Sequence, residues 1–239
     1  MCLMENEAAM RITSLNLRGF FEWEERSQRI VAYLKRMDPD VLLFQEVVYL
    51  PAVSAFSPVE LLNRDLGYPF RHESITRLQR GRTAQDYREG LAILSRWPVP
   101  ASEAVVLHHE DNDPHQRIVQ FVDVEQDGRV WPLANVHLSV RDDFALGHLE
   151  EVLEIVAGKE ERRILGGDFN VDHLERHAHL WRGRAVLTSE VEQYVSRPAS
   201  HENDDYFLVP TDYEIRSLQL SGDELSDHRA LTVDLRLAP

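Results

Sequence analysis

The chain has 239 residues, of which 43% are hydrophobic and 28% charged, a globular composition that excludes collagen-like, disordered and disulfide-rich proteins. Its formal net charge of −15 argues against a surface that is basic throughout, but it leaves room for a local basic groove. The single cysteine, Cys2, cannot form an internal disulfide, so we expect a reducing compartment.

The N-terminal sequence MCLMENEAAM has no basic region, and Glu5 and Glu7 interrupt its short apolar runs, so we expect no signal peptide. The sequence contains no run of about 18 apolar residues, so we expect no transmembrane segment. These features predict a cytoplasmic protein for which no obligate protein partner is evident. We expect residues 1–9 to form a flexible extension and residues 10–239 to form a single domain.

The predicted elements are many short strands and few helices. In chain order, a strand over 12–17 is followed by a helix over 22–37 and by a strand over 41–44 that is apolar on both faces. Further strands are predicted over 91–95, 118–124, 130–138, 163–165, 206–209 and 230–237, with a second helix over 142–156. This succession favours an α+β or α/β sandwich over a barrel of regular βα units, while a doubly wound parallel sheet stays open.

Polar side chains stand where five of these apolar runs end or begin. They are Asn16, Gln45-Glu46, His137, Asp168 with Asn170, and Asp227-His228. A polar group next to a buried strand destabilises the fold by roughly 1–3 kcal/mol unless it is paired. Five such positions therefore predict one shared site at an edge of packed sheets.

The residue types at these positions indicate metal-assisted hydrolysis. Glu46, Asp168 and Asp227 offer hard oxygen ligands, which suit Mg²⁺ or Mn²⁺ better than zinc. His137 and His228 can transfer protons near neutral pH.

The ordered motifs SLN, FQEV, GLAILSR, NVHL, GDFN, DYF and SDH resemble those of the endonuclease/exonuclease/phosphatase superfamily, over residues 11–237. The resemblance implies a deoxyribonuclease-like four-layer αββα sandwich, in which two mixed β-sheets lie face to face between helices. It also implies a Mg²⁺-dependent phosphoester hydrolase, Mn²⁺ being the alternative ion, of the phosphodiesterase or nuclease type. A phosphoester, and among phosphoesters nucleic acid, is the expected partner.

The resemblance also implies roles for individual residues. Glu46 is similar to the principal metal ligand, with Asn16 and Asp227 beside it. His228 is similar to the general base that activates water or to a histidine that binds a phosphate oxygen, and Asp205 is similar to the carboxylate that orients it.

A second set of roles concerns phosphate and leaving group. Asp168 and Asn170 are similar to residues that position water, metal and phosphate, and His137 to one that protonates the leaving oxygen or stabilises the phosphorane. The substrate-binding residues implied by the resemblance are Arg117, Tyr87 and Glu89. One departure is Asp204, which stands before the DYF motif where the family has an apolar residue.

Several readings stay open from the sequence. Residues 71–88 carry five arginines against two acidic residues and form either a solvated loop or an arm that grips phosphate. His173, His177 and His179 form either a polar helix face or an extra metal site. The substrate is alternatively a small phosphoester such as an inositol phosphate or a lipid headgroup, and the same fold could also serve as a non-catalytic binding module.

Overall fold

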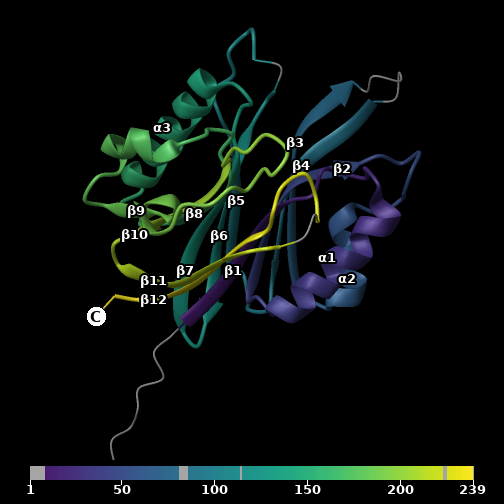
Figure 1. Ribbon diagram of the computed structural model, residues 1–239, viewed down its shortest axis with the longest axis horizontal. Coiled ribbons are helices and arrows are strands. Elements are labelled where there is room, and N and C mark those ends of the chain that lie inside the picture. Colours follow the sequence, from purple (N-terminus) through teal and green to yellow (C-terminus); the bar gives the residue numbers. More distant parts are fainter. Residues whose placement is uncertain (1–8, 81–85, 114, 223–224, 239) are drawn as a thin grey trace, which may run out of the picture.

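The computed structural model describes residues 9–80, 86–113, 115–222 and 225–238, so all but the last residue of the predicted 1–9 extension lies outside the described residues. Two six-stranded sheets pack face to face (Figure 1). In spatial order, the first contains β11 (Tyr213–Leu220), β12 (Leu231–Leu237), β1 (Ala9–Asn16), β2 (Val41–Tyr49), β4 (Asp86–Ser95) and β3 (Phe70–Arg80). The second contains β5 (Ala101–Val106), β6 (Ile118–Gln126), β7 (Arg129–His137), β8 (Ile164–Asp168), β10 (Asp205–Pro210) and β9 (Ala185–Leu187).

Both sheets are mixed. The β1–β2 pair of the first sheet and the β7–β8 pair of the second are parallel, whereas β1–β12 and β8–β10 are antiparallel. Because β1, β2, β7 and β8 end at one edge of the sandwich, the polar residues that follow or end these strands are carried to the same place.

Helices cover the outer face of each sheet (Figure 1). Leu42 and Phe44 of the first sheet pack in one apolar cluster with α1 (Trp23–Met37) and α2 (Pro58–Leu66). The second sheet packs against α3 (Asp142–Gly158), with the short helices η1 (Leu174–Leu180) and α4 (Thr188–Val191) nearby. A third cluster, which includes Leu43 and Leu133, fills the space between the sheets. The predicted four-layer sandwich is therefore confirmed.

Some predicted boundaries differ from the structure. The strand predicted over 41–44 continues to Tyr49, because Gln45 and Glu46 form a bulge instead of ending it. The sequence analysis also missed α2, although its start carries a strong signal. There the Ser57 hydroxyl accepts from the Glu60 N–H, the Glu60 carboxylate accepts from the Ser57 N–H, and Pro58 occupies the first turn.

Among the described residues, none of the helices has the length and apolar character that a membrane span requires.

Candidate active site

A cleft of about 530 Å³ opens at the edge of the sandwich where β1, β2, β7 and β8 end. Nine of the predicted site residues line this cleft, namely Glu46, Tyr87, Glu89, Arg117, His137, Asp168, Asn170, Asp227 and His228. The other two, Asn16 and Asp205, are each 1% exposed and bond directly to lining residues. The structure thus brings together residues as far apart in the chain as Asn16 and His228.

Asn16 connects the two sheets at the base of the cleft. Its amide nitrogen donates to Glu46 Oε1 at 3.2 Å and to Asp168 Oδ2 at 2.9 Å. Its amide oxygen accepts from the backbone N–H of Arg18, which fixes the orientation of the amide. In this arrangement Asn16 orients two carboxylates, and its role as a direct metal ligand stays a prediction.

Glu46 reaches the cleft through a β-bulge. Phe44 pairs with Ala92 and Val47 with Gly90, so Gln45 and Glu46 together oppose the single residue between them on β4. Glu46 adopts a left-handed φ of 50°, which is unfavourable for a side chain with a Cβ and typical of functional sites. Without the extra residue, the alternation of side chains along β2 would continue unbroken through the site.

Asp168 ends β8 after two glycines. Gly167 has a φ of +145°, and a Cβ at this position would lie 2.1 Å from Val136 O on the neighbouring strand. The glycine therefore lets β8 pass close to β7. Asp168 Oδ1 accepts from the Asn170 N–H at 3.0 Å, and the Asn170 amide donates to Leu138 O at 3.1 Å. These two hydrogen bonds fix the turn that follows β8.

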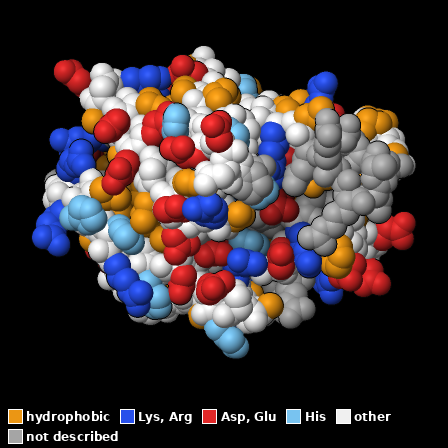
Figure 2. Space-filling view, turned by 90° about the horizontal axis from the view of Figure 1, so that it is seen from above, with side chains coloured by type: hydrophobic (Ala, Val, Ile, Leu, Met, Phe, Trp, Pro, Cys, Tyr) orange, Lys and Arg blue, Asp and Glu red, His pale blue; other side chains and the backbone are white. Residues whose placement is uncertain are grey.

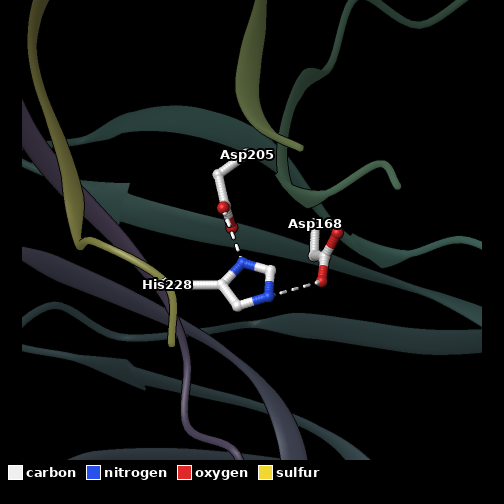
Figure 3. A group of neighbouring side chains, drawn as sticks. All are labelled: Asp168, Asp205 and His228. Carbon is white, nitrogen blue, oxygen red and sulfur yellow. Dashed lines mark hydrogen bonds and ion pairs between the residues drawn. The ribbon is translucent and has the colours of Figure 1, made fainter. Parts of the chain in front are cut away.

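His228 lies between two carboxylates (Figure 3). Its Nδ1 is 2.7 Å from Asp205 Oδ2, and its Nε2 is 3.8 Å from Asp168 Oδ2. Burial opposes a charged imidazole, but the carboxylates of Asp205 and Asp168 outweigh burial and raise the pKa of His228. Burial raises the pKa of Asp168 as well, although the charge of His228 acts against this. Asp205 fixes the tautomer of the ring and leaves Nε2 toward Asp168 and the cleft.

The opposite wall of the cleft carries His137 beside a buried guanidinium. Arg117 Nη1 and Nη2 lie 3.2 and 3.1 Å from the two ring nitrogens of His137. Glu89 Oε1 lies 3.3 Å from Arg117, and Glu89 Oε2 lies 3.2 Å from Arg77 Nη2. Burial, reinforced by Arg117, lowers the pKa of His137 well below its ordinary value. A neutral imidazole can form a hydrogen bond to a phosphoryl or leaving oxygen, but it is poorly suited to act as a general acid, which must carry an extra proton.

Several other residues that line the cleft were not among the predicted site residues. They are Arg77, His115, Val140, Asp142, Asp172, Arg197, Glu202 and Asp204. The unusual residue Asp204 accepts from Arg197 at 3.0 Å, so its departure from the family pattern was a usable signal. Figure 2, which views the molecule from the top of Figure 1, shows acidic side chains intermingled with basic side chains near the centre of this face.

Within the arginine-rich segment 71–88, residues 71–80 belong to β3 and residues 86–88 to β4, whereas residues 81–85 lie outside the described residues. Arg71 pairs with Glu60 and Glu73, whereas Arg77 lines the cleft. Arg82 and the side chain of Arg80 lie outside the described residues, so the proposed grip on phosphate by these two arginines stays a prediction.

The donor set of the cleft fits a hard divalent cation. Eight carboxylates and three arginines line it, which leaves an excess of negative charge. Burial and the neighbouring Glu89 raise the pKa of Glu46. The positive charge near Glu46 therefore does not offset the cost of burying its carboxylate, and a bound cation would supply the missing charge. Ligand atoms of Asp168, Asp205 and His228 lie within 4.8 Å of one another, and Glu46 is joined to Asp168 through Asn16. Oxygen-rich sites of this kind bind Mg²⁺ or Mn²⁺.

The histidines of the 173–179 segment lie apart from this group. His173 is half exposed and pairs with Asp172 and Glu175, and the rings of His177 and His179 are 6.2 Å apart in η1. Within the described part of the chain, no group of three converging His, Cys or carboxylate ligands includes any of them. The polar-face interpretation therefore explains these histidines better than an extra metal site.

Comparisons with known proteins agree with this geometry. A family model described as the Endonuclease/Exonuclease/phosphatase family matches residues 13–228. A search of curated proteins finds no match.

Solved structures share the fold at low sequence identity. An endonuclease/exonuclease/phosphatase from Beutenbergia cavernae DSM 12333 has a TM-score of 0.78 and 19% identity over 96% of this chain and 72% of that chain. The human Nocturnin catalytic domain has a TM-score of 0.74 and 18% identity over 96% and 95% of the two chains. D. rerio TDP2, complexed with single-strand DNA product, has a TM-score of 0.73 and 17% identity over 96% and 100%.

Proposed function

Because the chain belongs to the endonuclease/exonuclease/phosphatase family, whose members hydrolyse phosphoester bonds, we propose that it is a Mg²⁺-dependent phosphodiesterase that activates water at His228. The observation that carries this proposal is the position of His228 between Asp205 and Asp168 in the same cleft as Glu46. A base, its orienting carboxylate and oxygen ligands for a cation are the parts that metal-assisted phosphoryl transfer to water requires.

The residues that would hold Mg²⁺, or alternatively Mn²⁺, are Glu46, Asp227 and Asp168, with Asn16 orienting Glu46 and Asp168 through its amide. A divalent cation bound there supplies positive charge that offsets the anionic phosphoryl group and the carboxylates that raise the pKa of His228. Asp227 Oδ2 also lies 3.4 Å from Arg18 Nε, which restrains this carboxylate at the rim.

In this mechanism His228 Nε2 takes a proton from the attacking water, while Asp205 holds Nδ1 at 2.7 Å and stabilises the imidazolium that forms. Asp168 and Asn170, joined at 3.0 Å, position the water for in-line attack.

The facing wall binds the phosphoryl oxygens. Arg117, held by Glu89, supplies a buried positive charge beside the neutral ring of His137. His137 then acts as a hydrogen-bond partner for the leaving oxygen or the pentacoordinate phosphorus centre. Its N–H stabilises charge that develops during the reaction.

Two substrate classes are consistent with this site. Tyr87 and Arg77 on the cleft wall favour a nuclease, because an aromatic ring can stack on a base and an arginine can pair with phosphate. The excess of carboxylates favours a small phosphodiester, such as an inositol or lipid-headgroup ester, because a long polyanion would be repelled. A non-catalytic binding module is disfavoured, because such a module has no use for an oriented histidine next to metal-binding carboxylates.

Hydrolysis of bis-p-nitrophenyl phosphate by the purified chain tests the proposal. We expect release of p-nitrophenol with Mg²⁺ or Mn²⁺ and its loss with EDTA. Glu46→Gln and His228→Ala should each lower kcat by at least about 10²-fold while leaving the unfolding transition in place. Glu103→Gln is the matched control, because Glu103 is exposed, forms an ion pair with Lys159 and does not line the cleft among the described residues. Metal-independent hydrolysis, or full activity in either folded site variant, would contradict the mechanism.

The substrate class is decided by a parallel screen of single- and double-stranded DNA, RNA, cyclic nucleotides, inositol phosphates and phospholipids, each with Mg²⁺ and then with Mn²⁺. The natural substrate class is the one that is hydrolysed with the highest kcat/KM and whose hydrolysis is lost in His228→Ala.

A further inference from the structure

Buried side-chain amides cross the interior between the two sheets, directly below the cleft. Gln45 of the first sheet donates through Nε2 to Asn135 Oδ1 of the second sheet at 2.8 Å. The Asn135 amide lies 3.4 Å from Gln120 Oε1, and Gln120 Nε2 returns to the first sheet at Ser74 Oγ, 3.1 Å away. The three amide residues are at most 1% exposed. Polar groups in this otherwise apolar layer require a specific reason, because each must be fully hydrogen-bonded.

Asn135 also bonds to the backbone of the opposite sheet. Its Nδ2 lies 3.1 Å from Phe44 O and 3.2 Å from Ala92 O. Phe44 and Ala92 are the last β2–β4 pair before the bulge that contains Glu46. A bulge locally disrupts the ladder of its strand pair, so a donor supplied from outside the sheet stabilises this break.

The amide contacts reach both walls of the cleft. Gln45 immediately precedes Glu46, whose φ of 50° is held only by its surroundings. Asn135 is two residues before His137 on β7, so both side chains project from the same face of that strand. A displacement of Asn135 would therefore move the carboxylate on one sheet relative to the imidazole on the other.

We propose that Asn135 is a positioning residue that holds the Glu46 bulge in its metal-binding conformation and sets the distance between the Glu46 and His137 walls of the cleft. The effect of Asn135 on metal binding rests on the proposed function, whereas its effect on the conformation of the bulge does not. Groups that hydrogen-bond behind metal ligands typically contribute 10–100-fold in metal affinity, about the range expected here.

The test is Asn135→Leu, which keeps the approximate shape of the side chain and removes all its hydrogen bonds. We expect the dissociation constant for Mn²⁺, measured by calorimetry on the metal-free chain, to rise at least about tenfold. We expect hydrogen exchange of the amides of residues 45–47 to accelerate at least about tenfold in the metal-free protein. Turnover should fall through kcat, because the Glu46 carboxylate that would hold the cation is displaced relative to His137.

The matched control is Leu133→Ala. Leu133 lies two residues before Asn135 on β7 and is fully buried in the same layer between the sheets, and its side chain carries no hydrogen-bonding group. This variant loses stability by leaving a cavity, but it should bind Mn²⁺ as the wild type does and exchange residues 45–47 at the wild-type rate relative to its own global unfolding.

Equal Mn²⁺ affinity and equal local exchange in Asn135→Leu and wild type would overturn the proposal, as would equal losses in Asn135→Leu and Leu133→Ala. If Asn135→Leu does not fold, Asn135→Ala replaces it, because the methyl group also removes the donor to Phe44 O and Ala92 O without adding a charge. The same results then decide. If the wild type neither binds Mn²⁺ nor hydrolyses any phosphoester, the proposed function fails, and local exchange at residues 45–47 alone decides the role of Asn135.

Discussion

Adjacent aspartates in this protein have different partners, and the difference follows from strand geometry. Asp205 begins β10 and contacts His228 at 2.7 Å, whereas Asp204, one residue earlier, accepts from Arg197 at 3.0 Å. Both are at most 5% exposed. Because successive residues of an extended chain project to opposite sides, only one of the two can orient the imidazole.

Asp205→Asn should lower kcat by about 10²–10⁴-fold, because the amide can stabilise neither the correct His228 tautomer nor the imidazolium. Steady-state kinetics on bis-p-nitrophenyl phosphate with saturating Mg²⁺ measure this change. Asp204→Asn is the matched control, with the same substitution one residue away, and its kcat should stay within about tenfold of wild type. Comparable losses in both variants would show that the charge of the region matters rather than the contact with His228.

The residues of the site could be predicted to a large extent from motif order. All eleven predicted residues are gathered at the cleft, because they lie at strand ends, near strand starts or in the β2 bulge along the same edge of the sandwich. Arg77 and Arg197 could not be found in this way. Arg77 enters the cleft after a register shift in β3 between Ile75 and Arg77, and Arg197 lies in an irregular segment bridged to Glu202. Hydrophobic periodicity carries no information about side-chain direction where the backbone is irregular.

At the scale of elements, the unpredicted strands share one property. β3, β5, β9 and β11 are the four edge strands of the two sheets, and the central strands were all predicted. Edge strands are partly exposed, as in β5, where five of six residues are exposed, so they lack the apolar runs that identify buried strands. The β2 bulge could not be predicted either, because its stabilising amide comes from Asn135 on another sheet.

Two glycines differ in the space around them, so the same substitution should change the stability of the protein in opposite directions. Gly167 lies at the close approach of β8 to β7, whereas Gly147 lies in a helix. Gly167→Ala places a Cβ about 2.1 Å from Val136 O at a φ that disfavours side chains, so we expect a loss of at least about 2 kcal/mol in unfolding free energy. Gly147 lies inside α3 with no atom within 4 Å of a Cβ, so Gly147→Ala should instead gain about 0.5–1 kcal/mol. Urea denaturation of both variants measures these changes. A Gly167→Ala variant as stable as wild type would show that β7 and β8 can separate without cost.

At the scale of the whole molecule, the net charge and the charge of the cleft have the same sign. The chain carries −15, and the cleft has eight carboxylates against three arginines. A nucleic-acid-binding protein normally neutralises phosphates with an excess of basic residues. Its affinity falls as the salt concentration rises, because binding releases counterions from the nucleic acid and this release is less favourable at high salt. Here the long-range field opposes the approach of a polyanion, whereas Arg77, Arg117 and Arg197, the arginines among the described residues that line the cleft, act in the other direction.

Because of this field, kcat/KM for a nucleic acid should rise with salt, the opposite of what is usual for proteins that bind nucleic acids. Raising ionic strength from about 0.01 M to about 0.15 M at fixed Mg²⁺ shortens the screening length from about 30 Å to about 8 Å, so kcat/KM for a single-stranded oligonucleotide should rise severalfold. For bis-p-nitrophenyl phosphate, which carries one negative charge, the change should be smaller. The double variant Asp142→Asn, Asp172→Asn removes two exposed charges from the cleft rim and should weaken the dependence for the oligonucleotide. A kcat/KM that instead falls with salt would show that the arginines outweigh the acidic field, and it would favour a nucleic acid as the natural substrate.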